Sequence, residues 1–138
     1  MANPDRGWEP MTLGDGFPPP GGAYSPGVRA GDLLFVSGQV PRDPRTGENT
    51  GGDIVAQSRR ALDNLRLVVE AAGATLGDVV SVTVYLADDG DWAAFNGVYR
   101  ETFRPPYPAR AVVGAALRGM LVEVSAVARL RSTERPAR

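Results

Sequence analysis

Apolar residues recur at helical spacing between positions 53 and 72 of this chain. Seven of them fall on one stripe: Ile54, Ala61, Leu62, Leu65, Val68, Val69 and Ala72. Such a stripe is typical of a helix that packs one side against a core. Asp53 suits the N-cap position, where its carboxylate can accept a bond from the first turn, and Gly73 suits the position after the last turn. The pattern predicts a helix over residues 53–72.

A second helix is expected over about residues 91–103. Its inner side would be formed by residues that share one face at helical spacing, namely Trp92, Phe95, Val98, Tyr99 and Thr102. We therefore place Trp92 and Phe95 in the core.

Strict alternation over residues 79–87 is typical of a strand with one buried face. The core side would carry Val80, Val82, Val84 and Leu86, and the other side Ser81, Thr83 and Tyr85. Upstream, two β-type runs at 24–28 and 33–38 flank Gly31-Asp32, which is the pattern of a hairpin turn.

Two further apolar runs lie near the C-terminus, and each contains one charged residue. Arg110 opens a run of small and β-branched residues over 111–116, and Glu123 interrupts the run 121–127. Buried charges are costly unless they are paired or used in chemistry. We therefore interpret the first run as a buried strand that begins with Arg110, and we treat both charges as candidate functional residues.

The order of these elements is ββαβαββ, which predicts an α+β domain with one mixed sheet and two helices packed on one face. The other face would carry Ser81, Thr83, Tyr85 and Ser125. A broad mixed face of this kind often packs against another subunit, so we expect an oligomer. Residues 1–22, rich in Pro and Gly, are expected to form an extended arm, residues 23–130 a single domain, and residues 131–138 a flexible tail.

Composition narrows the chemistry. The chain of 138 residues has no His and no Cys, and all 15 basic residues are Arg. Catalytic Ser-His and Cys-His arrangements, Schiff-base lysines and Cys/His metal sites are therefore excluded, and we expect neither a metal nor a cofactor.

The net charge of −1 offers no basic field for a nucleic-acid backbone. No signal peptide or membrane-length apolar run is visible, so a cytoplasmic location is expected.

The residues alone leave two interpretations of each charge open. The Arg110 guanidinium fits a carboxylate in a two-pronged hydrogen bond, and Glu123 could act as a general base. Alternatively, the two residues form a structural salt bridge, or Glu123 lies exposed at a strand edge.

Several motifs resemble those of the RidA/YjgF family of enamine and imine deaminases. They occur in the family's order at residues 22–28, 34–41, 71–74, 76–80, 108–110 and 121–124. The resemblance covers roughly residues 20–130. It implies a chorismate-mutase-like fold and a homotrimer with active sites in clefts between subunits. It also implies hydrolysis of 2-aminoacrylate and related 2-imino acids to 2-oxo acids and ammonia, without a cofactor.

The family's functional positions fall on Tyr24, Ser37, Asn96, Arg110 and Glu123. The resemblance implies that Arg110 holds the substrate carboxylate and that Glu123 activates water. Tyr24 would donate a hydrogen bond or close the site, although simple packing would also explain it. Ser37 and Asn96 would bind substrate, although Ser37 could instead cap a turn and Asn96 could face solvent.

Two positions depart from the family pattern: Ala23 replaces a common Pro, and Val112 replaces a common Cys. Together with the arm, Val112 leaves open a pathway-specific deaminase of a larger, aminomuconate-type substrate. The residues also leave open a non-catalytic trimeric module, either small-acid-binding or chaperone-like, and the ribonuclease activity of some family members. The near-neutral charge and the absence of His count against a ribonuclease.

Overall fold

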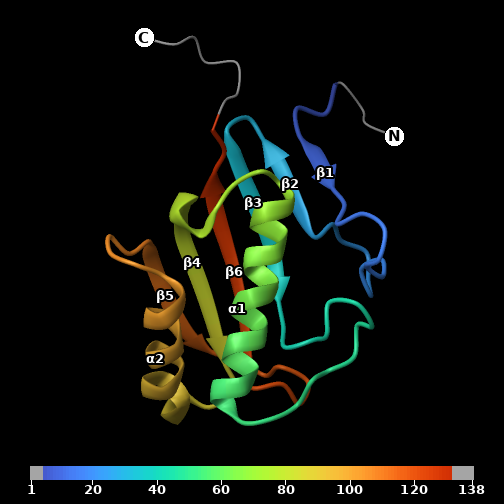
Figure 1. Cartoon of the computed structure of the whole chain (residues 1–138). Coiled ribbons are helices and arrows are strands. Elements are labelled where there is room, and N and C mark those ends of the chain that lie inside the picture. Colours follow the sequence, from blue (N-terminus) through green and yellow to red (C-terminus); the bar gives the residue numbers. More distant parts are fainter. Residues whose placement is uncertain (1–4, 132–138) are drawn as a thin grey trace.

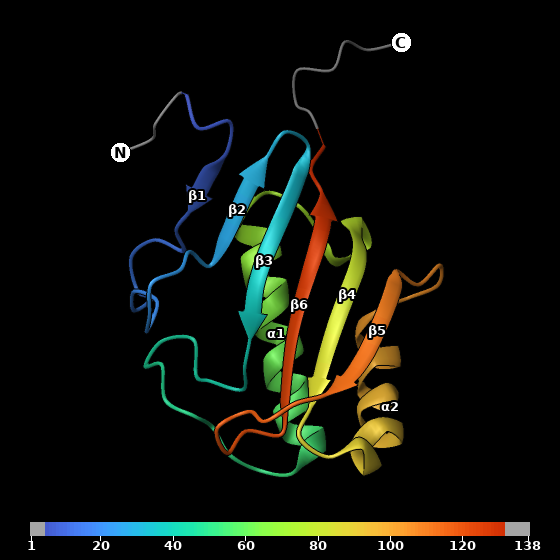
Figure 2. The same ribbon diagram turned by 180° about the vertical axis from the view of Figure 1, so that it is seen from behind.

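Both helices lie on one face of a single mixed sheet in the computed structural model, which describes residues 5–131 (Figures 1 and 2). The strands are β1 (Glu9–Met11), β2 (Gly27–Ala30), β3 (Leu33–Gln39), β4 (Val79–Leu86), β5 (Ala109–Gly114) and β6 (Val122–Arg129). The helices are α1 (Ile54–Ala71) and α2 (Trp92–Thr102); the short 3₁₀ turns are η1 (Leu76–Asp78), before β4, and η2 (Asp89–Asp91), before α2. The predicted α+β class is confirmed.

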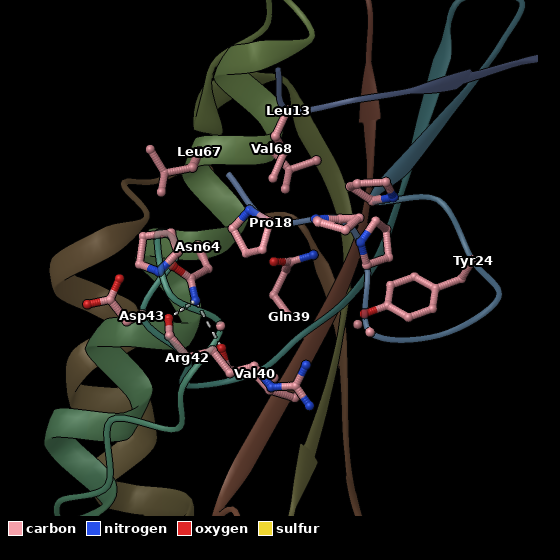
Figure 3. A pocket seen from close by; sticks show the side chains of 17 residues that line it. Leu13, Pro18, Tyr24, Gln39, Val40, Arg42, Asp43, Asn64, Leu67 and Val68 are labelled. Atoms are coloured by element: carbon pink, nitrogen blue, oxygen red, sulfur yellow. Dashed lines mark hydrogen bonds between the residues drawn. The ribbon is translucent and has the colours of Figure 1, made fainter. Parts of the chain in front are cut away.

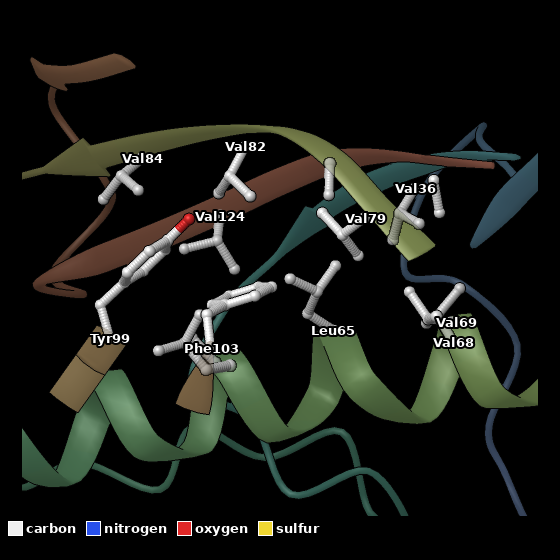
Figure 4. Close-up of a cluster of buried hydrophobic side chains, with 14 of the residues drawn as sticks. Val36, Leu65, Val68, Val69, Val79, Val82, Val84, Tyr99, Phe103 and Val124 are labelled. Carbon is white, nitrogen blue, oxygen red and sulfur yellow. The ribbon is translucent and has the colours of Figure 1, made fainter. Parts of the chain in front are cut away.

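The sheet has the order β1-β2-β3-β6-β4-β5, and only the β4–β5 pair is parallel. Long β6 lies at the centre, antiparallel to both β3 and β4. Alternate residues of these three strands are buried beneath the helices, with Leu65 of α1 packed among them (Figure 4). Neither helix in the described part of the chain is long and apolar enough to cross a membrane.

Helix α1 begins and ends where its capping residues predict. The Asp53 carboxylate accepts a hydrogen bond of 2.9 Å from the Ala56 amide, which satisfies an otherwise unpaired N–H of the first turn. Gly73 follows the helix with φ +87°, a conformation that costs glycine little. The hairpin turn at Gly31, with φ +59°, is likewise confirmed.

One position in β4 was predicted on the wrong face. A register shift between Val79 and Ser81 places Val79 in the core and leaves Val80 48% exposed. An extra residue in a ladder flips the side chains on one side of it. The rest of the predicted alternation, from Ser81 to Leu86, is observed.

Trp92 was also predicted wrongly as a core residue. It is 46% exposed at the first position of α2, whereas Phe95, Val98 and Tyr99 are buried as expected. The indole ring instead faces Arg110, whose guanidinium carbon lies 5.6 Å from the ring centroid.

The arm contains a strand that the sequence pattern does not predict. Residues 9–11 pair antiparallel with β2, and Met11 is buried against the point where Gly27 has no side chain. Residues 12–22 contain no helix or strand. Apart from Arg131, the predicted tail lies outside the described residues.

The prediction of a buried β5 is wrong for the single chain. This strand forms an edge of the sheet and pairs only with β4. Val113 is 44% exposed and Arg110 is half-buried. The reason is visible in Figure 2, where no second layer of the described residues covers the sheet face opposite the helices. Phe35, 45% exposed, lies on the same uncovered face, because it pairs with Val127 opposite the buried set.

Candidate functional site

A cleft of about 510 Å³ brings together Tyr24, Ser37 and Glu123. Tyr24 comes from the end of the arm, Ser37 from the end of β3 and Glu123 from the start of β6. The loop between β5 and β6 also lines the cleft, with residues 116–118 and Met120. Three of the five predicted site residues are therefore neighbours within one chain.

Strand register directs Glu123 into this cleft. It pairs with Tyr85 on the uncovered face, while its neighbours Val122 and Val124 are fully buried on the other. The β3–β6 ladder is irregular between Val36 and Gln39, which sets the end of β3 beside the carboxylate. Within residues 5–131 the Glu123 side chain has no hydrogen bond or ion pair, so its oxygens are available to a ligand or water.

Gly38 makes room for the carboxylate. A Cβ atom on this residue would overlap Oε2 of Glu123 and would lie 2.8 Å from its Cδ. Any larger residue would occupy the volume that the carboxylate now fills.

Ser37 anchors the segment that carries Tyr24. Its hydroxyl donates a hydrogen bond of 2.5 Å to the Ser25 carbonyl, and its amide donates one of 3.0 Å to the Pro26 carbonyl. Because the hydroxyl proton is engaged, Ser37 can offer a ligand only acceptor lone pairs. Tyr24 is 49% exposed, and its hydroxyl has no partner in the described part of the chain.

A smaller cavity of about 120 Å³ adjoins the cleft beneath the proline-rich arm (Figure 3). Tyr24 lies at the end away from α1, and Asn64 and Val68 of α1 form the other end. The Asn64 amide nitrogen donates hydrogen bonds of 3.0 and 2.8 Å to the Val40 and Arg42 carbonyls, drawn as dashed lines in Figure 3. This buried amide fixes the backbone that leaves β3.

Arg110 and Asn96 form a separate pair at the β5 edge. The guanidinium Nη1 donates a hydrogen bond of 2.9 Å to the Asn96 side-chain oxygen, and its carbon lies 4.5 Å from the Tyr99 ring centroid. Asn96 is half-buried, so the solvent-facing interpretation is wrong. Trp92, Asn96 and Tyr99 share one stripe of α2 at helical spacing. This spacing could have revealed from the sequence that the three residues surround one partner, here Arg110.

Tyr99 supports Arg110 with its ring rather than its hydroxyl. Burial raises the pKa of the Tyr99 hydroxyl to about 12, although the neighbouring Arg110 charge opposes this shift. Within residues 5–131 the hydroxyl has no hydrogen-bond partner. The ring is therefore the useful part, because a guanidinium over an aromatic face is held by cation–π attraction.

The sheet separates Arg110 from Glu123. Arg110 pairs in register with buried Val82 and so lies on the helix side, whereas Glu123 pairs with Tyr85 on the uncovered side. Among residues 5–131 no salt bridge joins them, and no ion pair to Arg110 occurs. The predicted site residues thus form two groups, with Tyr24, Ser37 and Glu123 in the cleft, and Arg110 and Asn96 at the β5 edge.

Comparisons with known proteins agree on one family. The family described as endoribonuclease L-PSP matches residues 17–130. A RutC family protein of Pyrococcus horikoshii is 46% identical over 113 residues, covering 80% of this chain and 90% of its own. A 2-iminobutanoate/2-iminopropanoate deaminase of Escherichia coli is 39% identical, covering 78% of this chain and 87% of its own. The crystal structure of E. coli TdcF with bound serine superposes with a TM-score of 0.78 at 35% identity, covering 88% and 97% of the two chains.

Gly38→Ala is expected to displace the Glu123 carboxylate while the fold keeps its stability. The new methyl group meets only the end of a flexible side chain, which can rotate away. A crystal structure and a thermal melt of the variant would check both parts. Gly27→Ala is the matched control, because its methyl would meet Met11 and the Phe35 carbonyl and should destabilise the β1–β2 pair. A carboxylate that stays in place in Gly38→Ala would contradict the assignment.

Tyr99→Phe is expected to leave stability at pH 7 unchanged or raised, by up to about 1 kcal/mol, because it removes a buried hydroxyl that has no partner among the described residues. The folded-state pKa is about 12 and the unfolded value is 10, so the wild type loses stability as the pH rises from 10 to 12. The variant should lose less over that range. Denaturant titrations from pH 7 to 12 would measure the difference, and equal losses in both proteins would refute the shift.

Proposed function

The chain belongs to the endoribonuclease L-PSP family, and we propose that it hydrolyses 2-imino acids to 2-oxo acids and ammonia. Relatives at 39% and 40% identity are named 2-iminobutanoate/2-iminopropanoate deaminase, while others carry only the RutC family name. The observation that carries the proposal is the Glu123 carboxylate, unpartnered among residues 5–131, in a cleft, together with a guanidinium at Arg110 that no described carboxylate neutralises.

Arg110 is suited to hold the substrate carboxylate. A guanidinium has five N–H donors, and Asn96 accepts from one of its nitrogens, which leaves the remaining edge for a two-pronged bond. The Tyr99 ring and Asn96 fix its orientation before substrate arrives. Such preorganisation lowers the entropic cost of placing the substrate.

Glu123 is suited to activate water. Its carboxylate takes a proton as the water oxygen bonds to the imine carbon C2. Glu123 returns this proton to the imine nitrogen, which gives a carbinolamine at C2. The hydroxyl proton of the carbinolamine is then transferred to the same nitrogen as the C2–N bond breaks, so that ammonia leaves and C2 becomes the carbonyl carbon of a 2-oxo acid. The imine carbon is already electrophilic, so a positioned water and a proton relay suffice. Tyr24, which lines the cleft, can donate a hydrogen bond from its hydroxyl to the substrate or to this water.

We further propose that each complete site is built from two copies of the chain. Arg110 and Glu123 lie on opposite sides of one sheet, so a substrate cannot bridge them within a single chain. The uncovered face, with Phe35 and Val113 exposed, offers the apolar surface for the contact. The homotrimer implied by the resemblance would bring Arg110 and Asn96 of one copy against Tyr24, Ser37 and Glu123 of the next.

The wild-type chain is expected to accelerate release of ammonia and 2-oxo acid from 2-imino acids generated by an amino-acid oxidase. Glu123→Gln should lower kcat about 10²–10⁴-fold because the general base is lost. Arg110→Ala should lower kcat/KM about 10²-fold or more, since two charge-assisted hydrogen bonds disappear. Arg29→Ala, on an exposed part of β2, is the control expected to match the wild type. Full activity in Glu123→Gln, or none in the wild type, would refute the proposal, and binding without turnover in the wild type would indicate the non-catalytic module.

Co-expressed Arg110→Ala and Glu123→Gln chains are expected to regain activity that neither has alone. In a random equal mixture, about a quarter of inter-subunit sites would combine an intact arginine with an intact glutamate. Activity of the co-purified mixture would be compared with that of the separate variants. Activity no higher than the average of the two variants would show that one chain supplies both residues.

A further inference from the structure

Two arginines line the cleft without a part in the proposed hydrolysis. Arg42 follows the end of β3, and Arg118 lies in the loop between β5 and β6. Neither guanidinium has an ion pair or side-chain hydrogen bond within residues 5–131. Their charges are therefore available to a ligand.

The cleft is more positive than the chain that forms it. Its lining carries Arg42 and Arg118 against one carboxylate, Glu123. The whole chain has 15 basic and 16 acidic residues, and elsewhere several arginines pair with nearby carboxylates, as Arg66 does with Asp63 and Glu70. A local excess of positive charge in a concave site favours a ligand with additional negative charge.

The backbone at Arg118 supports a role for its side chain. Among residues 5–131 it is the only non-glycine residue with positive φ, at +54°. This conformation is unfavourable for an L-residue, and Gly119 beside it, with φ +87°, shows that the loop already uses glycine where the chain turns. Residues with strained backbone cluster at functional sites, and this one places a cation in the lining of the cleft.

Arg42 is held in place from beneath. The buried Asn64 amide donates a hydrogen bond of 2.8 Å to the Arg42 carbonyl, and Asn64 itself accepts from Arg60. The Arg42 amide donates to the Val40 carbonyl at 2.8 Å. Its backbone is thus tied to α1, and Arg42 lines both the cleft and the cavity beneath the arm.

We propose that this cleft selects 2-imino acids that carry a second carboxylate, which Arg42 and Arg118 bind. The inference rests on the proposed function and specifies its substrate class. Arg110 of a neighbouring copy would hold the carboxylate next to C2, and Glu123 would face C2. The distal carboxylate would then lie toward the two arginines. Water adds to C2, ammonia leaves, and the product is a 2-oxo dicarboxylate.

The test compares two imines of similar length generated in situ, one from glutamate by glutamate oxidase and one from methionine by an amino-acid oxidase. The wild type should prefer the glutamate imine in kcat/KM. In Arg42→Gln/Arg118→Gln the ratio of the two kcat/KM values should fall about 10–100-fold, as expected for the loss of charged hydrogen bonds. Arg29→Gln, which changes an exposed arginine outside the cleft, should keep the wild-type ratio. No wild-type preference, or an unchanged ratio in the double variant, would overturn the inference.

The variant Arg118→Gly distinguishes the effect of the Arg118 charge from the effect of its backbone conformation. Glycine adopts φ +54° without strain, so the melting temperature should not fall, yet the preference for the glutamate imine should weaken as in Arg118→Gln. A retained preference would overturn the role of Arg118.

Binding distinguishes failure of this inference from failure of the proposed function. If the wild type accelerates neither imine, the deaminase proposal fails. Calorimetry with 2-oxoglutarate and 2-oxo-4-methylthiobutanoate then tests whether the cleft prefers a dicarboxylate. Tighter binding of the dicarboxylate that is lost in Arg42→Gln/Arg118→Gln would support the dicarboxylate site by itself. Equal binding of the two acids would overturn it.

Discussion

The alternation of side chains along β-strands governs how the functional residues of this chain are distributed. A residue on a strand must point to one face of the sheet or the other. Pairing with Val82 commits Arg110 to the helix side, and pairing with Tyr85 commits Glu123 to the uncovered side. The two helices pack on the first face and the second is uncovered, so a single chain does not bring the two residues together. This is why the proposed site needs a second copy of the chain.

Residues without chemistry of their own set the geometry of both groups. Gly38 leaves the volume that the Glu123 carboxylate occupies, and Asn64 fixes the backbone that carries Arg42. On the other side, Tyr99 provides a flat surface for Arg110 while its own hydroxyl stays unsatisfied among the described residues. A buried polar atom without a partner normally costs stability. In this chain, the residue whose hydroxyl is unsatisfied, Tyr99, is also the one whose ring orients the Arg110 guanidinium.

The sequence predicts local features well and tertiary ones poorly. Helix α1 could be located to within a residue, because its apolar stripe and the caps at Asp53 and Gly73 are encoded side by side. The error at Val80 arose because a bulge depends on the neighbouring strand, which no local pattern contains. The predicted site residues were found chiefly through resemblance to a family. Their division into two groups required the sheet register, and Arg42 and Arg118 became visible only when the fold brought two distant segments around one cleft.

The short strand in the arm determines how the sheet can grow. β1 is only three residues long, and its middle residue is Pro10, which has no N–H to donate to a further strand. It covers the open edge of β2 and offers almost no edge itself. Continuous strand addition, the route by which exposed edges lead to aggregation, is therefore blocked on this side. The uncovered sheet face, with Phe35 and Val113 exposed, is then the apolar surface that remains for the two-copy site that we propose.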